Sequence, residues 1–172
     1  MTHTLHITLA QINPLVGDLP YNLAKIRAVI ADAPDNTDLI VFPELAICGY
    51  MPEDLILKPA FLDRVQSAIG ELVKDSASYG TYIIVPAPHR EGEKIYNAAH
   101  VIGDGKIQTT ILNHHLPNYG VFDERRVFKP GPLPDILDFK GHKIGLMVCE
   151  DMWANDVAVH LHKKGAEMLI VT

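Results

Sequence analysis

The sequence has 172 residues, of which 48% are hydrophobic and 21% charged, a composition that suits one globular domain with a sizeable core. The formal net charge of −6 offers no basic surface to nucleic acid. No apolar run reaches the roughly 18 residues that span a membrane, and the first residues lack the layout of a signal peptide. We therefore expect a cytoplasmic protein that binds neither nucleic acid nor membranes.

Short β-rich runs alternate with helical ones along the chain. In chain order the sequence predicts a strand over 5–11, a helix over about 20–33, a strand over 39–42, a helix over 61–79, a strand over 82–85, a hairpin of 97–102 and 107–112, a strand over 144–148, a helix over 153–164 and a last strand over 168–171. Apolar strands interleaved with helices indicate an α/β or α+β fold, and the hairpin indicates mixed sheets. The chain stops inside a strand, so we expect a truncated domain.

Two predicted strand ends carry reactive side chains. Glu44 follows the strand over 39–42, and Cys149 follows the strand over 144–148. In α/β sheets, functional groups collect beyond the carboxyl ends of strands. A cysteine between a strand and a helix can be stabilised as thiolate, and a nearby carboxylate can take its proton. The alternative is that Cys149 is a core residue and Glu44 a solvated one, as we expect Cys48 to be a buried hydrophobe.

Three ordered blocks of sequence resemble the nitrilase superfamily of carbon–nitrogen hydrolases. They are the glutamate block FPEL at 42–45, the block LPNYGVFDE at 116–124 and the cysteine block IGLMVCEDMW at 144–153. The second and third are similar to one branch, the N-terminal glutamine amidase domain of glutamine-dependent NAD⁺ synthetases. The resemblance runs from residue 5 to residue 172 and implies an α-β-β-α sandwich with mixed sheets, incomplete at its C-terminus.

The resemblance also implies a Glu-Lys-Cys triad that hydrolyses L-glutamine. Glu44 would deprotonate Cys149, and the thiolate would attack the side-chain amide carbon and release ammonia. Water would then hydrolyse the thioester with Glu44 again as the base. The backbone N–H of Glu150 is a natural donor to the oxyanion.

Four further residues receive roles from the same resemblance. Glu150 and Tyr119 would contact glutamine, with Tyr50 near the pocket, and Glu124 would support the triad. The alternatives are that both tyrosines are half-buried aromatic residues and that Glu124 pairs with a neighbouring arginine at the surface.

One position departs from the family pattern. The triad lysine stands three residues before the Leu-Pro of the second block, where this chain has Asn113. Neither Lys106, in the hairpin turn, nor Lys129, beyond the block, replaces it. Asparagine is neutral and cannot offset the charge of a thiolate, and loss of one oxyanion donor alone typically costs about 10²–10³ in rate. We therefore expect weak or absent glutaminase activity, whether Asn113 is natural or engineered.

The chain is also shorter than the resemblance would require. The resemblance implies further amidase sequence after residue 172 and then a synthetase domain, which uses ATP and Mg²⁺ to amidate deamido-NAD. We predict that residues 1–172 are a partial amidase domain without a synthetase domain, poorly stable as a monomer because strand edges are uncovered. The amidase step needs no cofactor. The expected partners are L-glutamine, a synthetase domain or chain, and further copies in a homo-oligomer.

Histidine pairs invite a metal hypothesis, at His114-His115 and at His160 with His162. Adjacent residues of a strand point to opposite faces, and residues two apart on a helix do not face together. We therefore expect solvated or structural histidines and no metal. Two other functions stay open: another nitrilase-superfamily amidase acting on a free amide, and a non-catalytic interaction module that retains the fold.

Overall fold

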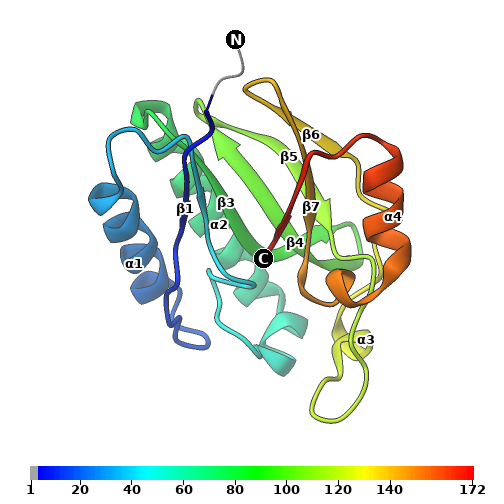
Figure 1. Ribbon diagram of the computed structural model, residues 1–172. Helices are drawn as coiled ribbons and strands as arrows, with labels where there is room; N and C mark the ends of the chain where they lie inside the picture. Colours follow the sequence, from blue (N-terminus) through cyan, green and yellow to red (C-terminus); the bar gives the residue numbers. More distant parts are fainter. Residues whose placement is uncertain (1–3) are drawn as a thin grey trace.

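The computed structural model describes residues 4–172, and two β-sheets facing each other form its centre (Figure 1). The larger sheet has the strand order β1-β2-β3-β4-β5, and the smaller has the order β6-β7-β8. The strands are β1 (Ile7–Leu9), β2 (Leu39–Val41), β3 (Tyr82–Glu91), β4 (Lys94–Gly103), β5 (Lys106–Leu112), β6 (Ile136–Phe139), β7 (His142–Met147) and β8 (Met168–Val171). Both sheets contain parallel and antiparallel pairs, so the expected mixed sheets are confirmed.

Helices cover the outer face of each sheet, which completes the expected α-β-β-α sandwich (Figure 1). The helices are α1 (Leu19–Asp32), α2 (Pro59–Asp75), α3 (Glu124–Val127) and α4 (Asn155–Lys163), with short 3₁₀ turns η1 (Glu53–Leu57), η2 (Ser76–Ser78) and η3 (Cys149–Trp153). Asp18 caps α1 by accepting a hydrogen bond from the backbone N–H of Tyr21. Val157 and Leu161 of α4 pack against Met147 of β7 in a small buried cluster. No helix of the described part is long and apolar enough to cross a membrane.

The alternation of side chains along β7 explains how the layers join. Ile144, Leu146 and Val148 enter the core between the two sheets, whereas Met147 faces α4. Gly145 lies on the α4 side, where an added Cβ would come within 2.7 Å of Leu169. Because both faces of β7 are covered, the strand is anchored up to the residue that precedes Cys149. Each fully buried Leu, Ile or Val contributes roughly 1.5–3 kcal/mol.

Several predicted elements differ from the structure in extent. The strand expected over 82–85 continues to Glu91 and forms a second hairpin with β4. Pro86 and Pro88 argue against a strand in the sequence, because proline has no N–H to donate to a neighbouring strand. They are tolerated here because β2 pairs with β3 only up to Ile84, so β2 requires no hydrogen bond from either proline. The strand β6 was missed. The last strand, 168–171, is confirmed as predicted.

Candidate active site

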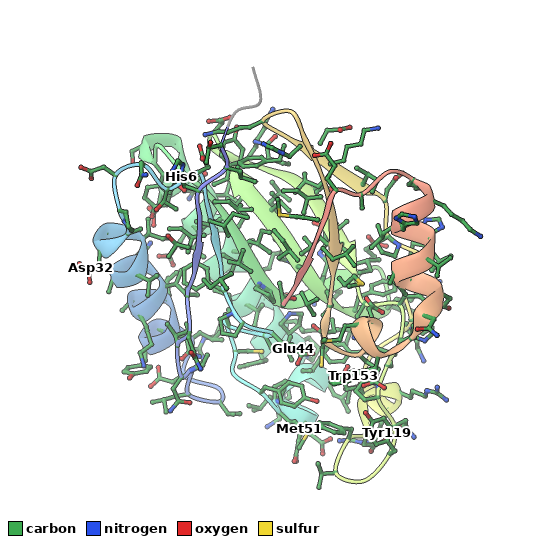
Figure 2. The ribbon with its side chains drawn as sticks, in the orientation of Figure 1. His6, Asp32, Glu44, Met51, Tyr119 and Trp153 are labelled. Carbon is green, nitrogen blue, oxygen red and sulfur yellow. The ribbon has the colours of Figure 1, made fainter. Side chains whose placement is uncertain are left out.

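The site lies where β2 and β7 end. Glu44 follows β2 through Phe42-Pro43, and Cys149 follows β7 through Val148. The two side chains lie close enough for each to shift the pKa of the other. Figure 2 shows Glu44 beyond the carboxyl ends of the strands, on the side of the molecule that also carries Met51, Tyr119 and Trp153. The predicted convergence of a thiol and a carboxylate is therefore present. Cys149 also packs against the core between the sheets, whereas Glu44 is not the solvated residue that the alternative expected.

The backbone at Cys149 turns sharply. Cys149 has a φ of +42°, a left-handed conformation that costs a non-glycine residue on the order of 1–3 kcal/mol. Its N–H donates to the carbonyl oxygen of Thr172 at 2.9 Å, which ties the turn to the end of β8. This conformation lifts the thiol out of the strand direction and into the space beside Glu44.

Asp151 holds that turn together, a role that no pattern in the sequence indicates. The buried carboxylate accepts the backbone N–H of Val148 at 3.2 Å on one oxygen. Its other oxygen accepts the backbone N–H groups of His114 at 3.1 Å and His115 at 2.8 Å. Asp151 therefore joins the Cys149 turn to the segment that carries Asn113.

Asn97 is the second functional residue that the sequence did not single out. Its side-chain amide donates to Glu44 Oε1 at 2.7 Å, and its side chain is fully buried in β4. A polar residue among apolar neighbours on a central strand was the available signal, since buried amides need partners. The bond fixes the direction in which the Glu44 carboxylate faces.

Burial governs the protonation of the Glu44–Cys149 pair. It raises the pKa of Glu44 to about 7, together with the charge of Glu124, while hydrogen bonds from Asn97 and Cys149 act in the opposite direction. Burial also raises the pKa of the Cys149 thiol well above its usual range, and the charge of Glu44 raises it further. The pair therefore holds a proton at neutral pH that Glu44 can accept and return.

Carboxylates supply the charges that act most strongly on this thiol among the described residues. Besides Glu44, they are Glu124 and Glu150, and each raises the pKa of Cys149. Lys106 and Lys129 are exposed, and neither supplies the missing positive charge. The thiolate thus lacks the cation that the family pattern would place beside it.

Asn113 occupies the middle of this region as a buried amide. Its N–H donates to the carbonyl oxygen of Asn97 at 2.8 Å, and its own carbonyl oxygen accepts from the N–H of Gly131 at 2.8 Å. The side chain is fully buried, and within residues 4–172 neither its nitrogen nor its oxygen has a hydrogen-bond partner. A buried amide without partners costs about 1–3 kcal/mol, so Asn113 lowers the stability of the fold.

Glu124 is buried at the start of α3, with 5% of its surface exposed. Tyr50 and Asn97 lie close enough to favour its ionised form, although neither meets the strict geometry of a hydrogen bond. Arg126 instead pairs with Asp54 and Asp123. The alternative of a surface ion pair for Glu124 is therefore wrong, and the buried carboxylate lies beside the pair as expected.

Aromatic side chains lie around Glu150, the residue that follows Cys149. The Tyr119 hydroxyl donates to Glu150 Oε2 at 3.0 Å, and Tyr119 is more than half exposed. Phe122 lies between the two tyrosines, with ring centroids 5.5 Å from Tyr119 and 6.4 Å from Tyr50. The three residues predicted to contact substrate, Tyr50, Tyr119 and Glu150, are thus linked by direct contacts and through Phe122.

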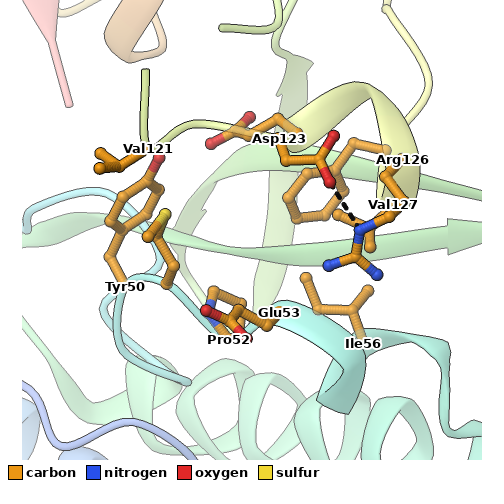
Figure 3. Close-up of a pocket in the computed structure, with 11 residues that line it drawn as sticks. Tyr50, Pro52, Glu53, Ile56, Val121, Asp123, Arg126 and Val127 are labelled. Carbon is orange, nitrogen blue, oxygen red and sulfur yellow. Dashed lines mark hydrogen bonds and ion pairs between the residues drawn. The ribbon is translucent and has the colours of Figure 1, made fainter. Parts of the chain in front are cut away.

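A pocket adjoins these residues. Tyr50 and Val121 line it at one end and Arg126 with Val127 at the other, above Pro52, Glu53 and Ile56 (Figure 3). Glu124 also contributes to its wall, which connects the pocket to the carboxylate cluster.

Cys48 lies where the sequence predicts it, whereas the rings of His114 and His115 do not. Cys48 is fully buried, and burial raises the pKa of its thiol, which confirms it as a core residue. The expectation that His114 and His115 point to opposite faces is wrong. They follow the end of β5, where the chain bends, and their ring centroids are 4.7 Å apart.

The comparisons with known proteins agree with this geometry. Residues 6–172 match the carbon–nitrogen hydrolase family, and the chain belongs to that family. Glutamine-dependent NAD⁺ synthetases from Xanthomonas campestris pv. campestris and Aquifex aeolicus are 40% and 39% identical to it over 98% and 96% of the chain. The structure of the glutamine-dependent NAD⁺ synthetase from Acinetobacter baumannii superposes with a TM-score of 0.91 at 33% identity, covering 96% of this chain and 31% of that one. The chain spans 31% and 29% of the length of the two curated relatives.

Proposed function

We propose that this chain is the glutamine-hydrolysing part of a glutamine-dependent NAD⁺ synthetase. The observation that carries the proposal is the proximity of the Cys149 thiol to the Glu44 carboxylate, beyond the C-terminal ends of β7 and β2 in the two facing sheets. The similarity to NAD⁺ synthetases along nearly the whole chain supports glutamine as the substrate.

The first half-reaction forms a thioester. Glu44 takes the proton of Cys149, and the thiolate attacks the side-chain carboxamide carbon of glutamine. The carbonyl oxygen becomes an oxyanion, for which the backbone N–H of Glu150 is the candidate donor. When the carbon–nitrogen bond breaks, Glu44 returns its proton to the leaving nitrogen and ammonia departs. The γ-glutamyl group remains on the sulfur.

The second half-reaction regenerates the thiol. A water molecule loses a proton to Glu44 and attacks the thioester carbon, and the second tetrahedral oxyanion collapses with release of glutamate. Cys149 leaves as thiolate and regains the proton from Glu44. A base with a pKa of about 7 suits both steps, because it can accept and donate a proton at neutral pH.

The polar groups near Cys149 suit the other end of glutamine. Glu150, held by Tyr119, offers a carboxylate to the α-ammonium group, and Tyr50 lines the adjoining pocket. The charge of Glu124 helps to raise the pKa of Glu44 to about 7, which makes Glu44 a stronger base towards the Cys149 thiol. The proposed role of Glu124 is therefore a positioning and electrostatic one.

The proposal extends to the reaction that uses the ammonia. A synthetase domain or chain would bind ATP and Mg²⁺ and amidate deamido-NAD, while the amidase step itself needs no cofactor. The homo-oligomer and the cytoplasmic location expected from the sequence belong to the same proposal. Light scattering of the protein after size-exclusion chromatography tests the first, and cell fractionation tests the second.

Asn113 sets the expected rate. Three carboxylates raise the pKa of the thiol, and Asn113 stands where the family pattern has the triad lysine. Thiolate formation is therefore unfavourable, so we propose that the chain hydrolyses glutamine weakly. This observation is also what favours the second candidate, a non-catalytic module that retains the fold.

Ammonia release from L-glutamine tests the proposal directly. We expect slow release by the chain, none by the Cys149→Ser variant and an unchanged rate in Cys48→Ala, the matched cysteine control. Faster release from acetamide than from glutamine would favour another amidase of the superfamily. No release from either amide, even after Asn113→Lys restores the cation, would favour the non-catalytic module.

A further inference from the structure

We propose that His114, His115 and Asp156 form a binding site for one divalent transition-metal ion of the Zn²⁺ type, next to the Cys149 turn. One ligand atom from each of the three side chains lies within 4.8 Å of the others. The two histidines follow β5 and the aspartate lies in the first turn of α4, so an ion here would fasten α4 to the segment that carries Asn113.

His114 is oriented as a metal ligand is. Its Nδ1 lies 2.7 Å from the carbonyl oxygen of Gly131. A carbonyl oxygen only accepts, so Nδ1 carries the proton and the lone pair lies on Nε2. A histidine that donates one ring N–H to a carbonyl and binds an ion through the other nitrogen is the usual arrangement in metal sites.

The other two ligands are already in contact. His115 Nε2 and Asp156 Oδ1 are 2.8 Å apart, and their side chains are 33% and 53% exposed, so an ion can reach them from solution. A tetrahedral Zn²⁺ with bonds of about 2.0–2.1 Å needs ligand atoms roughly 3.4 Å apart. Small side-chain rotations therefore suffice, and the ion takes the place of the proton between imidazole and carboxylate. Neutral His115 keeps its proton by moving it to Nδ1.

The remaining coordination position opens to a hollow. Arg125 and Lys129 line it together with the two histidines. A water molecule or an anion from solution can complete the coordination of the ion there. The positive charges of Arg125 and Lys129 would attract an anion to that position.

The site is mechanically connected to the nucleophile. The backbone N–H groups of His114 and His115 both donate to Asp151, which also holds the N–H of Val148 before Cys149. An ion bound to the two rings would restrict the same segment that supports the turn. Binding to the folded state alone also raises the melting temperature.

Metal titration of the chain, freed of metal by a chelator, tests the proposal. Calorimetry with Zn²⁺ should give one ion per chain, and Co²⁺ should give the absorption bands of a four-coordinate ion. The variants His115→Gln and Asp156→Asn should each weaken binding by at least about 100-fold, since even the loss of an outer-shell partner costs 10–100-fold. Circular dichroism establishes that both variants are folded.

Two matched variants separate this site from others. His162→Gln alters an exposed histidine of α4 outside the cluster and should leave binding unchanged. Cys149→Ser should also leave it unchanged, because the thiol is not a ligand. The melting temperature should rise with Zn²⁺ in the chain and not in His115→Gln. No binding, binding that survives His115→Gln, or binding lost with Cys149→Ser would each overturn the proposal.

Discussion

Asn97 donates a 2.7 Å hydrogen bond from its side-chain amide to Glu44 Oε1, and this bond fixes the general base beneath the thiol. A hydrogen bond to a carboxylate stabilises its ionised form and contributes about 1.5–3 kcal/mol when buried. Asn97 therefore opposes the burial that raises the pKa of Glu44.

Removal of this amide should weaken the base at neutral pH. In the Asn97→Ala variant the pKa of Glu44 should rise further, so the rate of glutamine hydrolysis should reach half its maximum at a higher pH than in the parent chain. A pH–rate profile gives the shift. Asn22→Ala removes another buried asparagine, one that bonds Leu15 and Ile47 and not Glu44, and should lower stability without moving the profile. Equal profiles for Asn97→Ala and the parent would exclude this role.

The raised pKa of Glu44 also predicts how stability depends on pH. The folded carboxyl stays protonated up to a pKa of about 7, whereas the unfolded one loses its proton near 4.5, so the folded state binds more protons between these values. Stability from this group is complete below 4.5 and is lost as pH rises towards 7. The loss is about 3.5 kcal/mol at most, taking about 1.4 kcal/mol per pKa unit over a shift from 4.5 to about 7.

Glu44→Gln removes that dependence because the amide does not titrate. We expect the variant to gain stability relative to the parent chain as the pH increases, with most of the gain between about pH 5 and pH 7. Urea unfolding at a series of pH values measures it. A constant difference between the two proteins would show that Glu44 titrates normally in the folded state.

Asn113→Lys should restore the cation that the thiol lacks. A buried ammonium beside the carboxylates lowers the pKa of both Cys149 and Glu44 and offers the oxyanion a charged donor. The rate of ammonia release should rise by about 10²–10³, and the pH–rate profile should move to lower pH. Asn113→Met is the control for length without charge and should give no gain. A gain of the same size with methionine would mean that packing, not charge, limits the rate.

Asp151→Asn should loosen the nucleophile turn. One carboxylate now accepts three backbone N–H groups, and the amide can replace only part of them. We expect a loss of about 1–3 kcal/mol in unfolding free energy, and a lower turnover number because Cys149 relaxes from its left-handed conformation. Asp35→Asn, in an exposed loop, is the matched control. Unchanged turnover despite the loss of stability would separate the turn from catalysis.

Much of the fold was predictable because its elements follow local patterns. The apolar strands at 39–42 and 144–148 are too short and too apolar to be surface elements, and their ends located Glu44 and Cys149. The missed strand β6 is short, and it depends on its hairpin partner β7 for its pairing.

The supporting residues were not predictable for a different reason. Asn97 meets Glu44 only because β4 lies beside β3, and Asp151 meets His114 only because the two sheets pack together. Such contacts join residues far apart in the sequence, and no local spacing encodes them. The pairing of the His114 and His115 rings likewise depends on a bend after β5 that the strand pattern does not reveal.

The most direct measurement is peptide mass mapping of the chain and its Asn113→Lys variant after an acid quench during glutamine turnover. We predict a γ-glutamyl group on the peptide that contains Cys149, more abundant in the variant that turns over faster, and none on the peptide that contains Cys48. Ammonia release with Cys149 unmodified, or undiminished in Cys149→Ser, would contradict the assignment of Cys149 as the nucleophile.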